Sequence, residues 1–133
     1  MDFEEKRLLV EVDFDDFLDQ KLSNIDADHE ETIAYIKSTL KKYIVPENDL
    51  SKKSITLVYA DACVKPSFKK YQEIGDWTFF SLSLKSDQTY SDLYEIMGRI
   101  SYHRCYKLLD RQWPLYNELA NKFGYFVSEL SKT

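Results

Sequence analysis

The chain has 133 residues, of which 44% are hydrophobic and 15% aromatic, with three glycines, three prolines and a formal net charge of −5. The length fits one globular domain, the apolar content argues against intrinsic disorder, and the few turn residues argue against an all-β fold. No stretch approaches the roughly 18 apolar residues of a membrane span. The acidic N-terminus is not typical of a secretion signal. We therefore expect a cytoplasmic protein that is not associated with membranes.

Charge is divided unevenly along the chain. Residues 1–31 hold 12 acidic and three basic side chains, a balance of −9, whereas residues 32–133 have a balance of +4. An acidic segment joined to a mildly basic body argues against nucleic-acid binding over the whole surface. It indicates either a basic partner or a contact between the two parts of the chain.

The first 25 residues are expected to form an acidic N-terminal extension of a helical domain that spans residues 26–133. A stripe of apolar residues favours a helix over residues 14–23. Residues 7–14 alternate between apolar and polar side chains, which is the period of a half-buried strand. Residues 1–13 are therefore left unassigned.

Residues 28–45 carry the clearest helical pattern in the first half of the chain. Four isoleucine and leucine residues at helical spacing share one face, and lysines occupy the remainder. Asp28 and Glu31 have the spacing of a capping box, and Pro46 ends the helix.

Two segments fit either a helix or a strand. Residues 53–63 contain the β-prone run Ile55-Thr-Leu-Val-Tyr59, although their apolar residues also share a helical face. Residues 77–84 would form a strand by propensity alone, whereas the longer segment 66–84 has apolar residues at helical spacing.

The last two helices have stronger patterns. Residues 89–110 place Leu93, Met97, Ile100, Cys105 and Leu108 on one broad face, which we expect to be buried. Residues 114–131 open with a proline, which a first helical turn tolerates. A glycine at position 124 interrupts this helix, and its small size is expected to admit an aromatic ring.

Four motifs occur in a fixed order in the chain. They are Tyr35-Ile-Lys-Ser-Thr-Leu40, Tyr71-x-x-Ile-Gly-Asp-Trp-x-Phe-Phe80, Tyr94-x-x-Met-Gly-Arg-x-Ser-Tyr102 and Glu118-Leu-Ala-x-x-Phe123. The ordered set resembles an uncharacterised family of small bacterial proteins with a Gly-Asp segment, a Met-Gly-Arg-x-Ser/Ala-Tyr segment and a Leu-Ala-x-x-Phe ending. The resemblance covers about residues 30–131 and implies an all-helical fold, with both ambiguous segments helical. It implies no activity, ligand or site.

The fold class that we expect is therefore a single all-α domain of five or six packed helices. The alternative is an α+β fold with short strands near residues 7–14, 55–60 and 77–84. Gly75 and Gly98 are expected at close contacts between helices.

A run of basic side chains on the penultimate helix is the first candidate site. Residues 99, 103 and 107 are four apart and share one helical face. Such a face could hold an acidic partner, although basic residues near the end of a helix also occur on ordinary solvated faces. The candidate partner-binding residues here are Arg99, His103, Arg104, Lys107 and Arg111.

The acidic extension is the second candidate partner-binding surface, with Glu11, Asp13, Asp15 and Asp16. These carboxylates lack the glycine-centred spacing of a calcium loop. They could bind a basic partner, dock on the basic helix of the same chain, or simply be solvated.

The sequence contains no residue spacing that is typical of a catalytic or metal-binding site. The two histidines and two cysteines have no zinc or redox spacing, and the cysteines are expected to be buried free thiols. Asp76 is expected to bond to a neighbouring tyrosine or to an arginine such as Arg99. We expect no cofactor and no metal.

The function that we expect is non-catalytic binding of another macromolecule, most simply another protein, by an inhibitor or immunity-type protein. The alternative is a small-molecule or lipid-binding helical domain with an aromatic cavity. The side chains that would line this cavity are Phe79, Phe80, Tyr102 and Trp113. The sequence leaves the partner's identity and the oligomeric state open.

Overall fold

The computed structural model describes residues 3–45, 48, 50, 53–84 and 91–132, with the side chains described from residue 13 onward. This part of the chain forms seven α-helices and no strand. The helices are α1 (Phe3–Leu22), α2 (Glu30–Tyr43), α3 (Ile55–Val64), α4 (Phe68–Leu84), α5 (Ser91–Leu108), α6 (Pro114–Asn121) and α7 (Phe123–Ser131). The all-α expectation is confirmed. The alternative strands near residues 7–14, 55–60 and 77–84 are wrong, because all three segments are helical.

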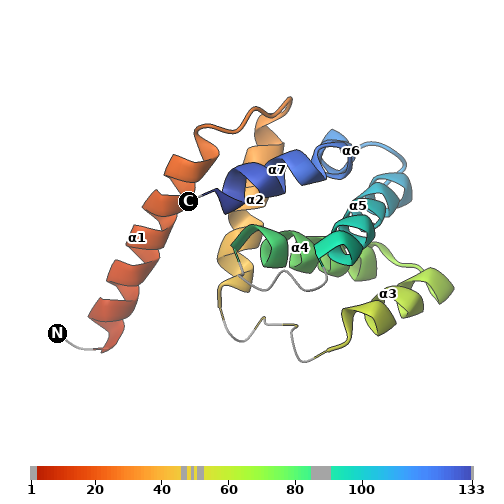
Figure 1. Cartoon of the computed structure of the whole chain (residues 1–133), viewed down its shortest axis with the longest axis horizontal. Coiled ribbons are helices and arrows are strands. Elements are labelled where there is room, and N and C mark those ends of the chain that lie inside the picture. Colours follow the sequence, from red (N-terminus) through yellow and green to blue (C-terminus); the bar gives the residue numbers. More distant parts are fainter. Residues whose placement is uncertain (1–2, 46–47, 49, 51–52, 85–90, 133) are drawn as a thin grey trace.

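α1 begins at Phe3, well before the expected start at residue 14, and lies to one side of the other helices (Figure 1). Its C-terminal half carries Leu18 and Leu22, which are both buried. These residues anchor the helix, which contacts α2 and α7. The N-terminal half points away from the other helices.

The helix pair α4 and α5 forms the centre of the fold, with α7 packed across it (Figure 1). A Cβ atom added to Gly75 would lie 2.8 Å from Cδ1 of Tyr102, and one added to Gly98 would lie 2.5 Å from Cζ of Phe123. No larger residue fits these positions without displacing a ring. The prediction that both glycines mark close helix contacts is confirmed.

The strand-like segment of α4 is buried on all sides. Every residue from Ile74 to Ser83 is buried. When every side of a helix is buried, its 3.6-residue apolar period is weakened, and residues 77–84 taken alone resemble a buried strand. The one threonine in this segment, Thr78, donates its hydroxyl to the carbonyl oxygen of Ile74 at 2.8 Å, which satisfies this polar group within the helix.

The predicted helix over residues 114–131 is two helices, so the chain has seven helices in its described part rather than five or six. The break falls at Lys122, with φ −108° and ψ 16°. Gly124 does not cause the break and does not admit a ring. A Cβ atom added there would lie 2.9 Å from a carboxylate oxygen of Glu95.

The capping box expected at the start of α2 does not form. The N-cap residue is His29, which makes no side-chain cap bond. Instead, the buried Glu118 of α6 accepts backbone N–H groups from Asp28 and His29. The carboxylate thus supplies from another helix the acceptor that a local side chain usually provides.

No helix in the described ranges combines the length and apolar character needed to cross a bilayer.

Candidate functional site

The outward surface of α5 brings together most of the basic residues singled out in the sequence. We call the exposed side chains Ile96, Arg99, Ile100, His103, Arg104 and Lys107 the α5 face. Arg111 does not belong to it, because α5 ends at Leu108 and both Asp110 and Arg111 adopt positive φ values. Arg111 nevertheless lies close enough to His103 to help lower its pKa.

The expectation that Leu93, Ile100 and Leu108 would be buried is wrong. All three are exposed, and so is Ile96, which is 47% exposed. The buried residues of α5 are Met97, Gly98, Ser101, Tyr102 and Cys105. Positions 98, 101, 102 and 105 follow the i, i+3, i+4, i+7 spacing of one helical face. The sequence contains this pattern, but it is hard to recognise because Gly98 and Ser101 are small residues and not hydrophobic ones.

The α5 face lines a shallow hollow of about 610 Å³. The opposite side of this hollow comes from Ala120 and Asn121 of α6. A second hollow, of about 280 Å³, is lined by Cys63, Tyr71 and Leu108 among others. Arg104 and Lys107 line both hollows, so they form the ridge between them.

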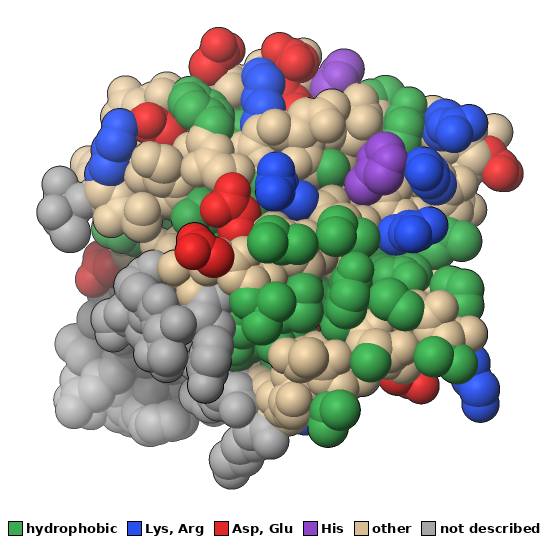
Figure 2. All heavy atoms as spheres, turned by 45° about the vertical axis from the view of Figure 1, so that its right-hand side comes forward, with side chains coloured by type: hydrophobic (Ala, Val, Ile, Leu, Met, Phe, Trp, Pro, Cys, Tyr) green, Lys and Arg blue, Asp and Glu red, His purple; other side chains and the backbone are tan. Residues whose placement is uncertain are grey.

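Apolar and basic side chains adjoin on this side of the molecule. Figure 2 shows hydrophobic side chains gathered in a continuous patch, bordered by Lys, Arg and His side chains. The exposed large hydrophobic residues include Ile96 and Ile100 of α5, and Leu57 and Val64 of α3. An apolar patch rimmed by polar residues is the usual mark of an interaction surface.

The cations of the α5 face, which are Arg99, Arg104 and Lys107, form no ion pair with any acidic side chain in the described ranges. Lysines elsewhere do form ion pairs. For example, Nζ of Lys70 lies 3.0 Å from Oδ2 of Asp61. The positive charge of this surface is therefore available to a partner.

Partial burial lowers the pKa of His103, and the neighbouring Lys107, Arg104 and Arg111 lower it further. The ring is therefore neutral at pH 7, and the charge of the α5 face comes from the arginines and the lysine.

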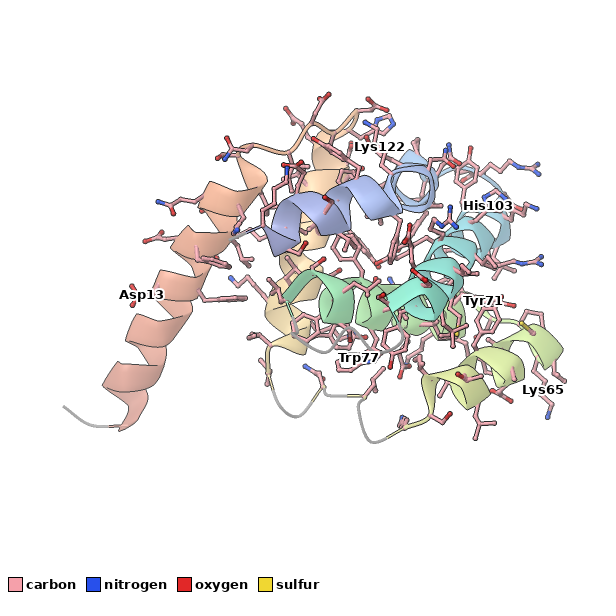
Figure 3. The ribbon with its side chains drawn as sticks, viewed as in Figure 1. Asp13, Lys65, Tyr71, Trp77, His103 and Lys122 are labelled. Carbon is pink, nitrogen blue, oxygen red and sulfur yellow. The ribbon has the colours of Figure 1, made fainter. Side chains whose placement is uncertain are left out.

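The acidic residues do not join the basic helix. Asp15 forms ion pairs with Lys37 at 3.0 Å and Lys41 at 2.8 Å of α2, and these lysines lower its pKa, Lys41 more than Lys37. Asp13 and Asp16 are exposed, and the Glu11 side chain lies outside the described residues. Figure 3 places Asp13 and His103 at opposite ends of the molecule. Among the described acidic side chains of α1, those that form ion pairs therefore bind lysines of α2 and not the basic residues of α5.

The four residues proposed for an aromatic cavity differ in exposure, and none of them lines either hollow beside α5. Phe79, Phe80 and Tyr102 are buried, and the Phe79 and Phe123 rings pack edge to face with centroids 5.4 Å apart. Trp113 is 55% exposed at the start of α6. The two hollows beside α5 are lined by other residues.

Asp76 is held between two tyrosines, as the sequence suggested, and not by Arg99. Its Oδ1 accepts hydrogen bonds from the hydroxyls of Tyr35 at 2.7 Å and Tyr102 at 2.8 Å. Burial raises the pKa of Asp76 to about 6, although both hydrogen bonds oppose this rise. The two hydrogen bonds join α4, which carries Asp76, to α2 and α5.

The structure also shows how exposed the two cysteines are and whether possible metal ligands cluster. Cys105 is buried, as expected, whereas Cys63 is exposed, which corrects the sequence-based prediction. Among the described residues, no three His, Cys, Asp or Glu side chains cluster as metal ligands would.

Comparisons with known proteins found no matching family model, no matching curated protein and no matching solved structure. The resemblance to a small bacterial family thus remains an expectation from the sequence motifs.

Proposed function

We propose that the protein is a non-catalytic binding protein and that it holds another protein on the α5 face. One observation carries this proposal. Arg99, Arg104 and Lys107, which have no ion-pair partner among the described side chains, lie beside the exposed Ile96 and Ile100 on one helical surface. Exposed isoleucines give up contact with water when a partner covers them, and the surrounding charges select and orient that partner.

The mixture of the two kinds of side chain favours a protein partner over a nucleic acid. A nucleic-acid site needs cations for phosphates but gains little from Ile96 and Ile100. A protein interface combines an apolar centre with a polar, charged rim, and arginine is enriched in such interfaces. An inhibitor or immunity-type protein is one form of this function, because covering a target's surface requires no catalytic group.

The test is affinity purification of the tagged protein from its host cells. The wild type is compared with the double variant Arg104→Glu and Lys107→Glu. A matched control carries Lys53→Glu and Lys69→Glu, which make the same change of net charge at exposed positions outside both hollows. We expect one stoichiometric partner with the wild type and the control, and its loss with the α5 variant. Retention of every partner by the α5 variant, with its helical circular dichroism unchanged, would refute the proposal.

A further inference from the structure

The α5 face changes character along the helix. Its first part carries the exposed aliphatic residues Ile96 and Ile100 with Arg99 between them, and its last part carries His103, Arg104 and Lys107. From Ile96 to Lys107 the helix rises by about 16 Å, at roughly 1.5 Å per residue. The surface is therefore a strip of about three turns with an apolar end and a basic end.

A groove lies beside the strip on the surface of the molecule. Ala120 and Asn121 of α6 form the far wall of the hollow of about 610 Å³. A second helix laid beside α5 would place its side chains in this groove, which is a common mode of peptide recognition. The cations would then lie along one edge of that helix.

We propose that the α5 face binds an acidic amphipathic helix of another protein, which lies antiparallel to α5. This inference deepens the proposed function and rests on it. The partner's apolar side chains cover Ile96 and Ile100, and its carboxylates face Arg99, Arg104 and Lys107.

The orientation follows from electrostatics. The basic end of the strip is the C-terminal end of α5. In the antiparallel arrangement, the partner's acidic residues lie in its own N-terminal turns, where negative side chains stabilise a helix. The two helix dipoles also oppose each other. A parallel partner would need its acids at its C-terminal end, where they destabilise the helix.

A second copy of this chain is a poorer occupant. Its acidic helix is α1, but Asp15 and Asp19 already pair with Lys37 of the same chain. Figure 1 shows α1 and α5 on opposite sides of the molecule. A contact between α1 of one copy and α5 of the next would therefore repeat in one direction instead of closing into a symmetric dimer.

The probe is a synthetic, fluorescently labelled, N-acetylated peptide of about 18 residues, long enough for the strip once it folds on the surface. It carries leucines along one helical face and glutamates in its first two turns. One control peptide replaces the glutamates by glutamines, and a second scrambles the sequence. Binding is measured by fluorescence anisotropy.

We expect the acidic peptide to bind about tenfold more tightly than either control peptide. The variant Arg104→Glu with Lys107→Glu should weaken its binding about tenfold, and Ile100→Ser about fivefold. The control variant Lys53→Glu with Lys69→Glu should bind as the wild type does. Equal binding of the acidic and glutamine peptides, or equal weakening by both charge-reversed variants, would overturn the proposal.

Other occupants would give different results. Self-association of the protein in sedimentation velocity, abolished by the Arg104→Glu and Lys107→Glu variant, would assign the face to a second copy and overturn the proposal. Binding to phosphatidylserine vesicles that the acidic peptide cannot displace would assign it to a membrane surface and overturn it too. A protein partner that requires the α5 face but is not displaced by the peptide would leave the proposed function standing and refute the acidic helix.

Discussion

Replacing Asp76 by asparagine tests the charge state of the carboxyl group at the centre of the fold. Burial raises its pKa from 3.8 to about 6, although Tyr35 and Tyr102 donate hydrogen bonds to it. A group whose pKa is raised on folding stabilises the folded state fully below its unfolded pKa. This contribution is lost as the pH rises through the folded value. Asp76 therefore contributes more to the stability of the folded state at about pH 4 than above about pH 6.

The magnitude follows from the two pKa values. A rise of about two pKa units corresponds to about 3 kcal/mol of free energy of unfolding, which is lost between about pH 4 and about pH 6. Asparagine has nearly the same shape and does not titrate. The free energy of unfolding of Asp76→Asn minus that of the wild type should therefore increase by about 3 kcal/mol as the pH rises through this window. Titration of all other groups cancels in the difference.

Urea unfolding followed by far-ultraviolet circular dichroism, at several pH values and constant ionic strength, measures this difference. Tyr35→Phe provides a second variant, because it removes one donor to the carboxylate and should move the titration to higher pH. A difference between Asp76→Asn and the wild type that does not vary with pH, or that falls as the pH rises, would refute the reasoning. Either result would mean that burial does not disfavour the charged form of Asp76.

Two further predictions concern stability. Gly98→Ala should lower the free energy of unfolding by about 1–3 kcal/mol, because the added methyl group would press on a buried ring, whereas Gly124→Ala meets only a flexible carboxylate and should be neutral or stabilising. Equal urea midpoints for these two variants would contradict the packing argument. Glu118→Ala should cost about 1–3 kcal/mol, since it leaves the N–H groups at the start of α2 without their acceptor. Burial opposes ionisation of Glu118, but hydrogen bonds from the backbone of Asp28 and from Lys122 hold its pKa below the ordinary 4.5. The contribution lost in this variant should therefore be complete above pH 4.5 and diminish as the pH falls below that value. A cost that grows on acidification would contradict this assignment.

Local sequence determined the elements that have one apolar face or a clear stop signal. α2 matches its predicted segment closely because its aliphatic residues repeat at helical spacing and a proline follows. The two glycines of α4 and α5 were correctly placed at helix contacts, because a glycine in a helix interior carries a local cost that close packing can offset. The all-α class also follows from the sequence.

Other features depend on residues that are distant in the chain. The helical state of residues 77–84 is set by neighbours on every side, and burial all round erases the periodicity that would reveal it. The N-terminus of α2 is capped by Glu118, which is about 90 residues away, so no local pattern could indicate it. For the acidic segment, the sequence left open a basic partner, a contact with the basic helix of the same chain, or simple solvation, and composition alone did not indicate the lysines of α2 that pair with Asp15.

The candidate site shows the same division. The sequence identified the basic residues at positions 99, 103, 104 and 107 and placed three of them on one helical face, because helical spacing is local. It assigned Ile100 to the interior, since it could not know that Gly98 packs against α4 and α7 and that Tyr102 packs against α4. Which side of α5 is inward depends on the shapes of the helices that pack against it. The tertiary structure therefore decided that the isoleucines lie beside the cations, and this combination is the basis of the proposed function.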